Sequence, residues 1–316
     1  DKTTNKSQLD AQGNGSSVSN TREEDSLMLS TLSGNKGVSL NAGNNLVAEG
    51  AQVDSQAGKI SVSAQDVTIK AATQDTYALD QEHTRNGSNK GSRVDETSSH
   101  EVVGSTFSGQ NGVDITARDK DITVTGSTIH SEKGEITLDA KQNVTLNTAT
   151  EENKKTVEEQ RSSKGFLSAS SEHTLQHDET TREKGSLLSG EKVTINAGND
   201  LTVKGSSVVA ENDVSLTAGN NVDITAATET DSHYLLEEKK KSGLMSSGGI
   251  GFSVGKQSSR HEVDEKGTTQ SQSVSTIGST QGNVNITAGN KLHVGGADLI
   301  AQKDLNLTGD SVQIDP

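Results

Sequence analysis

Short segments with alternating apolar and polar residues are the feature that most constrains the fold of this chain. Residues 192–224, KVTINAGNDLTVKGSSVVAENDVSLTAGNNVDI, contain four of them, beginning at Val193, Leu201, Val214 and Val222. Such alternation is typical of a strand that is buried on one face. The segments are joined in pairs through Ala-Gly-Asn turns, and Gly and Asn tolerate the positive φ that tight turns need. The 21-residue spacing from Val193 to Val214 indicates a stacked repeat protein.

The same pattern divides the chain into four modules, 37–111, 112–191, 192–282 and 283–316. Another short extended element lies between the second and third segments of each module, so three short strands describe one turn of a triangular prism. Stacked turns pair their strands in parallel about 4.8 Å apart, and parallel crossovers are right-handed with few exceptions. We therefore expect an all-β fold, with residues 37–316 forming one continuous right-handed parallel β-helix. Residues 1–36 are interpreted as the end of a preceding repeat.

Three insertions, near 72–101, 149–183 and 227–272, lack the coil period. They are rich in charged residues, Thr and Ser, and each has Gly near its middle. The flanking runs still alternate, which predicts β-hairpins that project from the solenoid between modules. A disordered loop is the alternative that this composition allows.

The composition permits a solenoid more readily than a compact globule. Only 28% of the residues are hydrophobic, the net charge is −15, and Cys is absent. A stack of repeats needs less apolar volume than a globule, because each repeat buries only a thin core against its neighbours. The acidic balance argues against nucleic acid as a partner. We expect a monomeric rod, and a fragment of a longer protein, because the chain begins and ends inside its own repeat pattern.

The coil VTINAGNDLTVKGSSVVAENDVSLTAGNNVDI and the stretch KSGLMSSGGIGFSVGKQSSRHEVDEKGTTQSQSVSTIGSTQGNVNITAGN carry a resemblance to a known family. The chain resembles the haemagglutinin repeats of filamentous-haemagglutinin-like exoproteins of Gram-negative bacteria. Within that family it is most similar to the second repeat region of contact-dependent growth inhibition exoproteins, which deliver toxins. The likeness covers nearly all of residues 37–316.

This resemblance implies secretion or display at the cell surface, with an outer-membrane two-partner transporter as the partner during export. It also implies a role in carrying a C-terminal toxin across the target cell's outer membrane, where that membrane or its proteins would be partners. Two alternatives stay open. One is the adhesive shaft of a filamentous haemagglutinin-like adhesin, and the less favoured one is a β-helix enzyme that degrades polysaccharides.

The apolar stretch 243–255, GLMSSGGIGFSVG, is the most informative part outside the coils. It alternates over nearly the 9–11 residues of a barrel-spanning strand. A weaker counterpart lies at residues 165–170. We expect these stretches to contact a membrane or a partner, while packing against the solenoid wall is the plainer alternative. The candidate contact residues are Leu244, Met245, Ile250, Phe252, Val254, Phe166 and Leu167.

No catalytic, cofactor-binding or metal-binding residue is predicted. His173 and His177 have a spacing that suits a metal on a helix, but they lie in an insertion that is predicted to be strand or loop. The abundant carboxylates lie in the insertions, and aromatic residues, which sugar-degrading enzymes use for stacking, make up only 2% of the chain. The carboxylates are therefore interpreted as a solvated charged surface.

Overall fold

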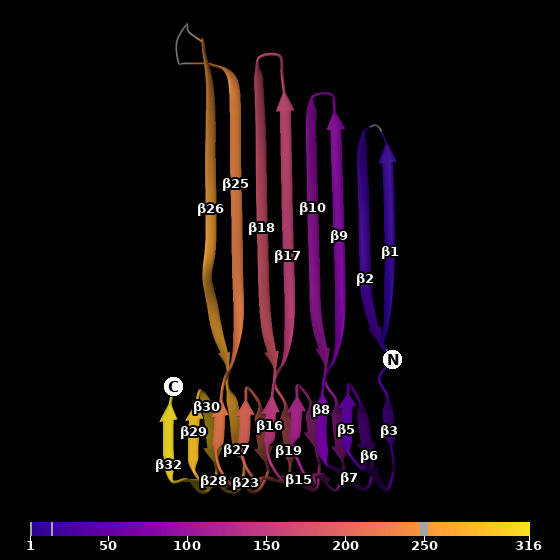
Figure 1. The fold of residues 1–316 in the computed structure, drawn as a ribbon, viewed down its shortest axis with the longest axis vertical. Helices are drawn as coiled ribbons and strands as arrows, with labels where there is room; N and C mark the ends of the chain where they lie inside the picture. The colour runs from indigo at the N-terminus through magenta and orange to yellow at the C-terminus, as the bar shows by residue number, and fades with distance from the viewer. Residues whose placement is uncertain (1, 14, 247–251) are drawn as a thin grey trace.

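The computed structural model describes residues 2–13, 15–246 and 252–316, and it contains strands but no helix within these ranges. The strands form four sheets of eight strands each. Three sheets are parallel and make the walls of a solenoid, and the fourth is antiparallel and projects from one side of it (Figure 1). The two ends of the chain lie at opposite ends of the solenoid.

Each wall takes one strand from every coil. The first wall contains β3 (Thr31–Ser33), β6 (Gln52–Ser55), β11 (Thr106–Gly109), β14 (Thr128–His130), β19 (Leu187–Gly190), β22 (Ser207–Ala210), β27 (Ser275–Ser279) and β30 (Ala297–Ala301). The second contains β4 (Gly37–Asn41), β7 (Lys59–Ala64), β12 (Val113–Ala117), β15 (Glu135–Ala140), β20 (Lys192–Ala197), β23 (Val214–Ala218), β28 (Val284–Ala288) and β31 (Leu305–Thr308). The third contains β5 (Asn45–Glu49), β8 (Asp66–Lys70), β13 (Ile122–Thr125), β16 (Val144–Asn147), β21 (Leu201–Lys204), β24 (Val222–Thr225), β29 (Lys291–Gly295) and β32 (Ser311–Asp315).

Inward-facing branched side chains form columns along the solenoid axis. In the second wall, parallel pairing aligns Val193 with Val214 and with Ile136, and all three are completely buried. Each such side chain contributes roughly 1.5–3 kcal/mol when it is fully buried. The column continues through Ile60, Val113 and Val284. The predicted all-β architecture of stacked parallel strands is confirmed, and the core is as narrow as the low apolar content requires.

The fourth sheet is built from four pairs of long antiparallel strands. The strands, in chain order, are β1 (Lys2–Gly13), β2 (Ser16–Leu27), β9 (Ala72–Asn86), β10 (Asn89–Val103), β17 (Ala149–Lys164), β18 (Ser168–Lys184), β25 (Ala227–Ser246) and β26 (Phe252–Ser273). Consecutive pairs also bond to each other, for example β10 to β17 and β18 to β25. We call this single layer the hairpin sheet. Its pairs lengthen from the N-terminal to the C-terminal end (Figure 1).

The pairs can join because their spacing matches that of the coils. The three strand pairs after the first, β9–β10, β17–β18 and β25–β26, follow coils that end in β8, β16 and β24. One strand pair is therefore inserted for every two coils. Two stacked coils and two paired strands both advance by about 9.6 Å, because neighbouring strands lie about 4.8 Å apart in either kind of sheet. Residues 2–27, which the sequence pattern left without a strand assignment, form β1 and β2 and stand before β3 as β9 and β10 stand before β11.

The corner between the third and first walls alternates between a hairpin and a glycine turn. Gly126 and Gly205 turn this corner with positive φ values of 55° and 54°, in coils that carry no hairpin. A Cβ atom at Gly205 would lie only 2.6 Å from the Cβ of Ala227, the first residue of β25. Glycine is therefore required here both by its backbone conformation and by the close approach of the neighbouring hairpin base.

Buried serines close the base of each of the three hairpins that follow β1 and β2. The Ser105, Ser186 and Ser275 hydroxyls donate to the carbonyls of Lys70, Asn147 and Thr225, at 2.8, 2.9 and 2.6 Å, and so join the chain just after a hairpin to the chain just before it. The same oxygens accept backbone N–H groups from the adjacent coils, as in the 3.3 Å bond from Ser127 to Ser186. These bonds satisfy polar groups at the one corner where the regular ladder is interrupted.

Candidate functional site

Among the described residues of the hairpin sheet, His173 and His177 have separate partners. His173 lies 2.9 Å from Glu158, whereas His177 bonds to Thr156 at 2.7 Å. Four residues along a strand span about 13 Å, which separates the two rings too far for one ion. Among the described residues, no three His, Cys, Asp or Glu side chains could hold a metal together. No helix in that part of the chain is long and apolar enough to cross a membrane.

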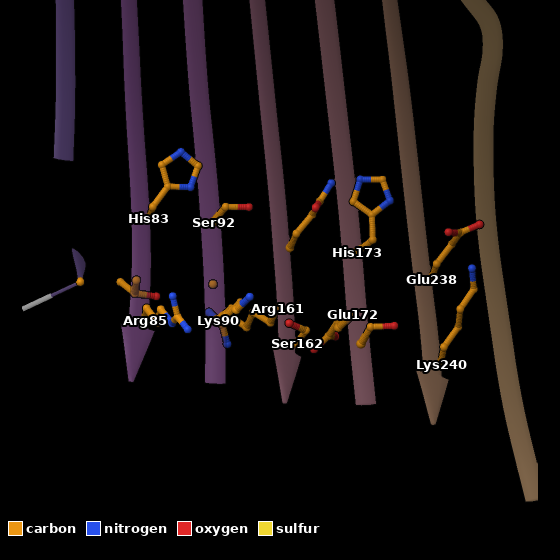
Figure 2. Close-up of a pocket in the computed structure, with 15 residues that line it drawn as sticks. His83, Arg85, Lys90, Ser92, Arg161, Ser162, Glu172, His173, Glu238 and Lys240 are labelled. Carbon is orange, nitrogen blue, oxygen red and sulfur yellow. The ribbon is translucent and has the colours of Figure 1, made fainter. Parts of the chain in front are cut away.

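A shallow groove of about 640 Å³ crosses the hairpin sheet near its free end (Figure 2). Two neighbouring hollows, of about 460 and 510 Å³, share several of its residues. Gly91 contributes to the hollow because it places no side chain between its strand neighbours Thr84 and Arg161. The groove is lined by Gly15, His83, Thr84, Arg85, Lys90, Gly91, Ser92, Gln160, Arg161, Ser162, Ser171, Glu172, His173, Glu238 and Lys240.

One row of side chains in this groove carries cations and hydroxyls but no carboxylate. Residues directly opposite each other in an antiparallel sheet lie on the same face. The register pairs Arg85 with Lys90, and the row then continues through two serines to Lys240 on β25. Figure 2 shows these side chains at one level of the sheet. The full row is Arg85, Lys90, Ser162, Ser171, Lys240 and Ser258.

The sign of the charge reverses along the hairpins. We call residues 84–91, 161–172, 239–243 and 255–259 the distal band; it contains eight Lys or Arg residues and one acidic residue, Glu172. The rows just nearer the solenoid, residues 81–83, 92–94, 158–160, 173–175, 236–238 and 260–262, contain six Glu and two Arg residues, and we call them the proximal band. The cations of the distal band are Arg85, Lys90, Arg161, Lys164, Lys239, Lys240, Lys241 and Lys256.

Most of this positive charge is not neutralised within the sheet. Lys239 pairs with Glu172 at 3.2 Å, and Arg161 pairs with Glu159. In the part of the chain that the structure describes, no ion pair joins an acidic side chain to Arg85, Lys90, Lys240 or Lys241, and all four are exposed. The distal band can therefore offer N–H donors and positive charge to an anionic ligand or surface.

The apolar residues predicted to contact a membrane lie in the β17–β18 turn, which the distal band includes, and on β25 and β26 beyond residues 243 and 255. Phe166 is 100% exposed and Leu167 is 56% exposed, in the turn between β17 and β18. The register of β25 and β26 pairs Leu244 with Val254, and Met245 and Phe252 pair with serines at the same end. This end of the hairpin is the one furthest from the solenoid (Figure 1). Ile250 lies outside the described residues. Packing of Phe166 and Leu167 against the solenoid wall, the plainer alternative, does not occur.

The sequence reasoning missed the cationic band. The strongest linear signal of this band is the run Glu237-Glu-Lys-Lys-Lys241, which taken alone is typical of a solvated strand end. The other cations come from separate hairpins and become neighbours only through pairing of β10 with β17 and of β18 with β25. Without that pairing, the positive charge is invisible in a chain with a net charge of −15.

Comparison with known proteins identifies the family. The family model described as hemagglutinin repeat matches residues 85–170 and 167–315, which is most of the chain. The chain belongs to this haemagglutinin-repeat family, and the predicted resemblance is confirmed. No solved structure matches it.

Its relatives include contact-dependent growth inhibition proteins. The 16S rRNA endonuclease CdiA of Enterobacter cloacae is 45% identical over 182 residues, 58% of this chain and 6% of that protein. The deoxyribonuclease CdiA of Dickeya dadantii is 44% identical over 184 residues, again 58% of this chain and 6% of that protein. The tRNA nuclease CdiA-2 of Burkholderia pseudomallei is 32% identical over 276 residues, 87% of this chain and 9% of that protein. The chain thus spans less than a tenth of the length of these relatives.

Proposed function

We propose that this chain is a structural and translocation segment of a secreted contact-dependent growth inhibition exoprotein, which helps to deliver a C-terminal toxin across the outer membrane of a target cell. One observation carries the proposal. The same repeat region recurs in relatives named for three different nuclease activities, against 16S rRNA, tRNA and DNA. A segment shared by proteins with different toxic activities serves a step common to all of them, and delivery is such a step.

The proposal includes the path and shape of the chain. Export by an outer-membrane two-partner transporter brings it to the surface of a Gram-negative cell, and the target-cell outer membrane or its proteins are its later partners. The solenoid is proposed to be right-handed and monomeric, in modules 37–111, 112–191, 192–282 and 283–316, with the hairpins as insertions between modules. In this scheme β1 and β2 are the hairpin that ends the preceding repeat. The right-handed sense follows from the crossover rule for parallel strands.

An in-frame deletion in the parent protein separates delivery from adhesion. Removing residues 2–316, which takes away whole coils together with their hairpins, is expected to leave attachment of producing cells to target cells intact and to abolish toxin entry. Toxin entry is measured as degradation of the toxin's substrate inside target cells. A control deletion of equal size elsewhere in the parent's repeats reports the effect of shortening alone. Loss of attachment would instead favour the adhesive shaft.

The enzyme alternative has a direct test. The chain is incubated with acidic polysaccharides, and the products are separated by size. We expect no shorter oligosaccharides to form, because the carboxylates of the hairpin sheet are spread over many rows and several of them are paired with cations, as Glu152 is with Lys154 at 3.1 Å. Appearance of such products would replace the delivery proposal with a β-helix hydrolase or lyase.

A further inference from the structure

We propose that the distal band of the hairpin sheet docks on a membrane surface through the phosphate groups of its lipids, with the apolar turn at Phe166 and Leu167 entering the lipid. This inference rests on the proposed role at a target membrane and specifies which part of the fold makes the contact. It follows from the order of residue types in the hairpin sheet. Acidic residues predominate in the proximal band, cations and hydroxyls in the distal band, and the apolar Phe166 and Leu167 are exposed in the turn between β17 and β18.

Folding alone does not explain the cationic row. Arg85 and Lys90 lie directly opposite each other on β9 and β10, and like charges in that arrangement destabilise a sheet. A carboxylate at Ser162 or Ser171 would offset this repulsion, as Glu172 does for Lys239 in the next row. The row instead carries serine hydroxyls, which can donate hydrogen bonds to an anion alongside the cations.

Phosphate is the anion that this set of groups fits. Guanidinium groups bind phosphate oxygens in bidentate fashion, ammonium groups add positive charge, and hydroxyls supply further donors. The cations of the row are spread over β9, β10 and β25 at one level, so they suit a surface bearing many phosphates more than one enclosed ligand.

The apolar ends favour a lipid membrane over a nucleic acid as the source of the phosphates. Lys164 precedes the fully exposed Phe166 by two residues, and Lys241 precedes Leu244 by three. These separations correspond to about 7 and 10 Å along a strand. The headgroup layer of a leaflet is about 5–8 Å thick. Cations at headgroup level would thus place Phe166 and Leu167 at the edge of the hydrocarbon, whereas a polynucleotide backbone offers these two side chains no apolar phase.

The test is binding of the chain to lipid vesicles. Vesicles of phosphatidylcholine with phosphatidylglycerol are compared with vesicles of phosphatidylcholine alone, by co-sedimentation at low salt. The triple variant Arg85→Gln, Lys90→Gln, Lys240→Gln removes the cations of the row. A matched control, Lys120→Gln, Lys133→Gln, Lys192→Gln, removes the same charge from exposed positions on the solenoid. Circular dichroism verifies that both variants keep their strands.

We expect the unmodified chain and the solenoid control to bind the anionic vesicles and the row variant to bind about a hundredfold more weakly, because each cation near an anionic surface is worth roughly a fivefold change in affinity. If the row variant loses its strands, the single substitutions Lys90→Gln and Lys240→Gln replace it, each with an expected loss of about fivefold.

Equal binding by row and control variants, or no preference for anionic vesicles, would overturn the inference. Inorganic phosphate at matched ionic strength is expected to compete weakly, and complete displacement by it would indicate a free-phosphate site. Tighter binding of single-stranded RNA than of vesicles would also refute the membrane assignment.

Entry of the turn into lipid has its own reporter. The chain contains no Trp, so Phe166→Trp introduces a single fluorophore at an apolar turn. We expect its emission to shift to the blue on anionic vesicles, whereas Val47→Trp, at a 60% exposed site on the solenoid, keeps its emission. Unshifted emission from the Phe166→Trp variant would limit the contact to headgroups and contradict the second half of the inference. The vesicle assays do not depend on the delivery function, so the two proposals can fail separately. If the parent protein that carries the row variant still delivers its toxin, the membrane role of the distal band is contradicted and the delivery function stands.

Discussion

Replacing Gly205 by Ala tests whether the corner between the third and first walls requires glycine. Gly205 has a φ of 54°, and a Cβ there would lie 2.6 Å from the Cβ of Ala227 and 2.7 Å from Cγ2 of Thr148. A left-handed conformation costs a non-glycine residue roughly 1–2 kcal/mol. Relieving the overlap requires movement of the β25 base, and overpacking of this kind costs about 1–3 kcal/mol. We expect Gly205→Ala to lower the free energy of unfolding by about 2–5 kcal/mol.

The measurement is urea denaturation followed by far-ultraviolet circular dichroism, with amide hydrogen exchange to locate the effect. The matched control is Gly43→Ala, in a turn of the solenoid where a Cβ would meet nothing within 4 Å and where φ is not positive. This control is expected to change stability by less than about 1 kcal/mol. Faster exchange in β22 and at the base of β25, with the rest of the solenoid protected, would match the local cause. A Gly205→Ala variant as stable as the Gly43→Ala variant would refute the reasoning about this corner.

Three further predictions concern the hairpin base, the core and a titrating pair. Ser186→Ala leaves the Ser127 N–H without its acceptor in a buried site, so it should lower the free energy of unfolding by about 1–3 kcal/mol. The control Ser163→Ala, at an exposed position, should leave that free energy nearly unchanged. Equal denaturant midpoints for the two variants would contradict the stabilising role of the buried serine at the hairpin base. Ile195→Ala, at a completely buried site, should cost about 2–5 kcal/mol, while Val47→Ala, 60% exposed, should cost far less, and similar losses would rule out a dry core column. The pKa of His293 is raised by its hydrogen bonds to Asp223, at 2.6 Å, and to Asp315. A raised pKa in the folded state means that the stabilisation is fully present below the unfolded pKa, about 6.5, and is lost as pH rises through the folded value. His293→Gln should therefore lower the denaturant midpoint at about pH 5.5 more than at about pH 9, and a difference independent of pH would exclude this linkage.

The sequence predicted the solenoid because its signals are local. Alternation within Val193-Thr194-Ile195, the Ala-Gly-Asn turns and the 21-residue spacing specify a strand, a corner and a coil without reference to the rest of the chain. Parallel pairing of Val193 with Val214 then follows from stacking of equal coils. The residues that begin the four predicted segments, Val193, Leu201, Val214 and Val222, are all buried, so the apolar period carries most of the information about this part of the fold.

The hairpin sheet was predicted less completely because its determinants are not local. The strands β1 and β2 carry few apolar residues, so residues 2–27 gave no strand signal beyond glycines near their middle. Joining of β10 to β17 depends on the equal advance of two coils and two strands, a relation between distant segments. A Gly-Ser pair recurs at 104–105, 126–127, 185–186 and 205–206, each time with an apolar residue two positions after the Ser. This pattern could have indicated the glycine turns and the buried serines at the hairpin bases. The distal band could not be recognised before that joining was known.

The match between two coils and one hairpin also limits how such an array can lengthen or shorten. Gain or loss of a single coil would shift all later hairpins by one strand width and leave the flanking pairs about 4.8 Å too far apart or too close to bond. Gain or loss of two coils with their hairpin restores both ladders at once. Copy number in this architecture is thus quantised in units of about 80 residues, as in the step from Val113 to Val193, and an insertion that ignores this unit would split the projecting layer while sparing the rod beneath it.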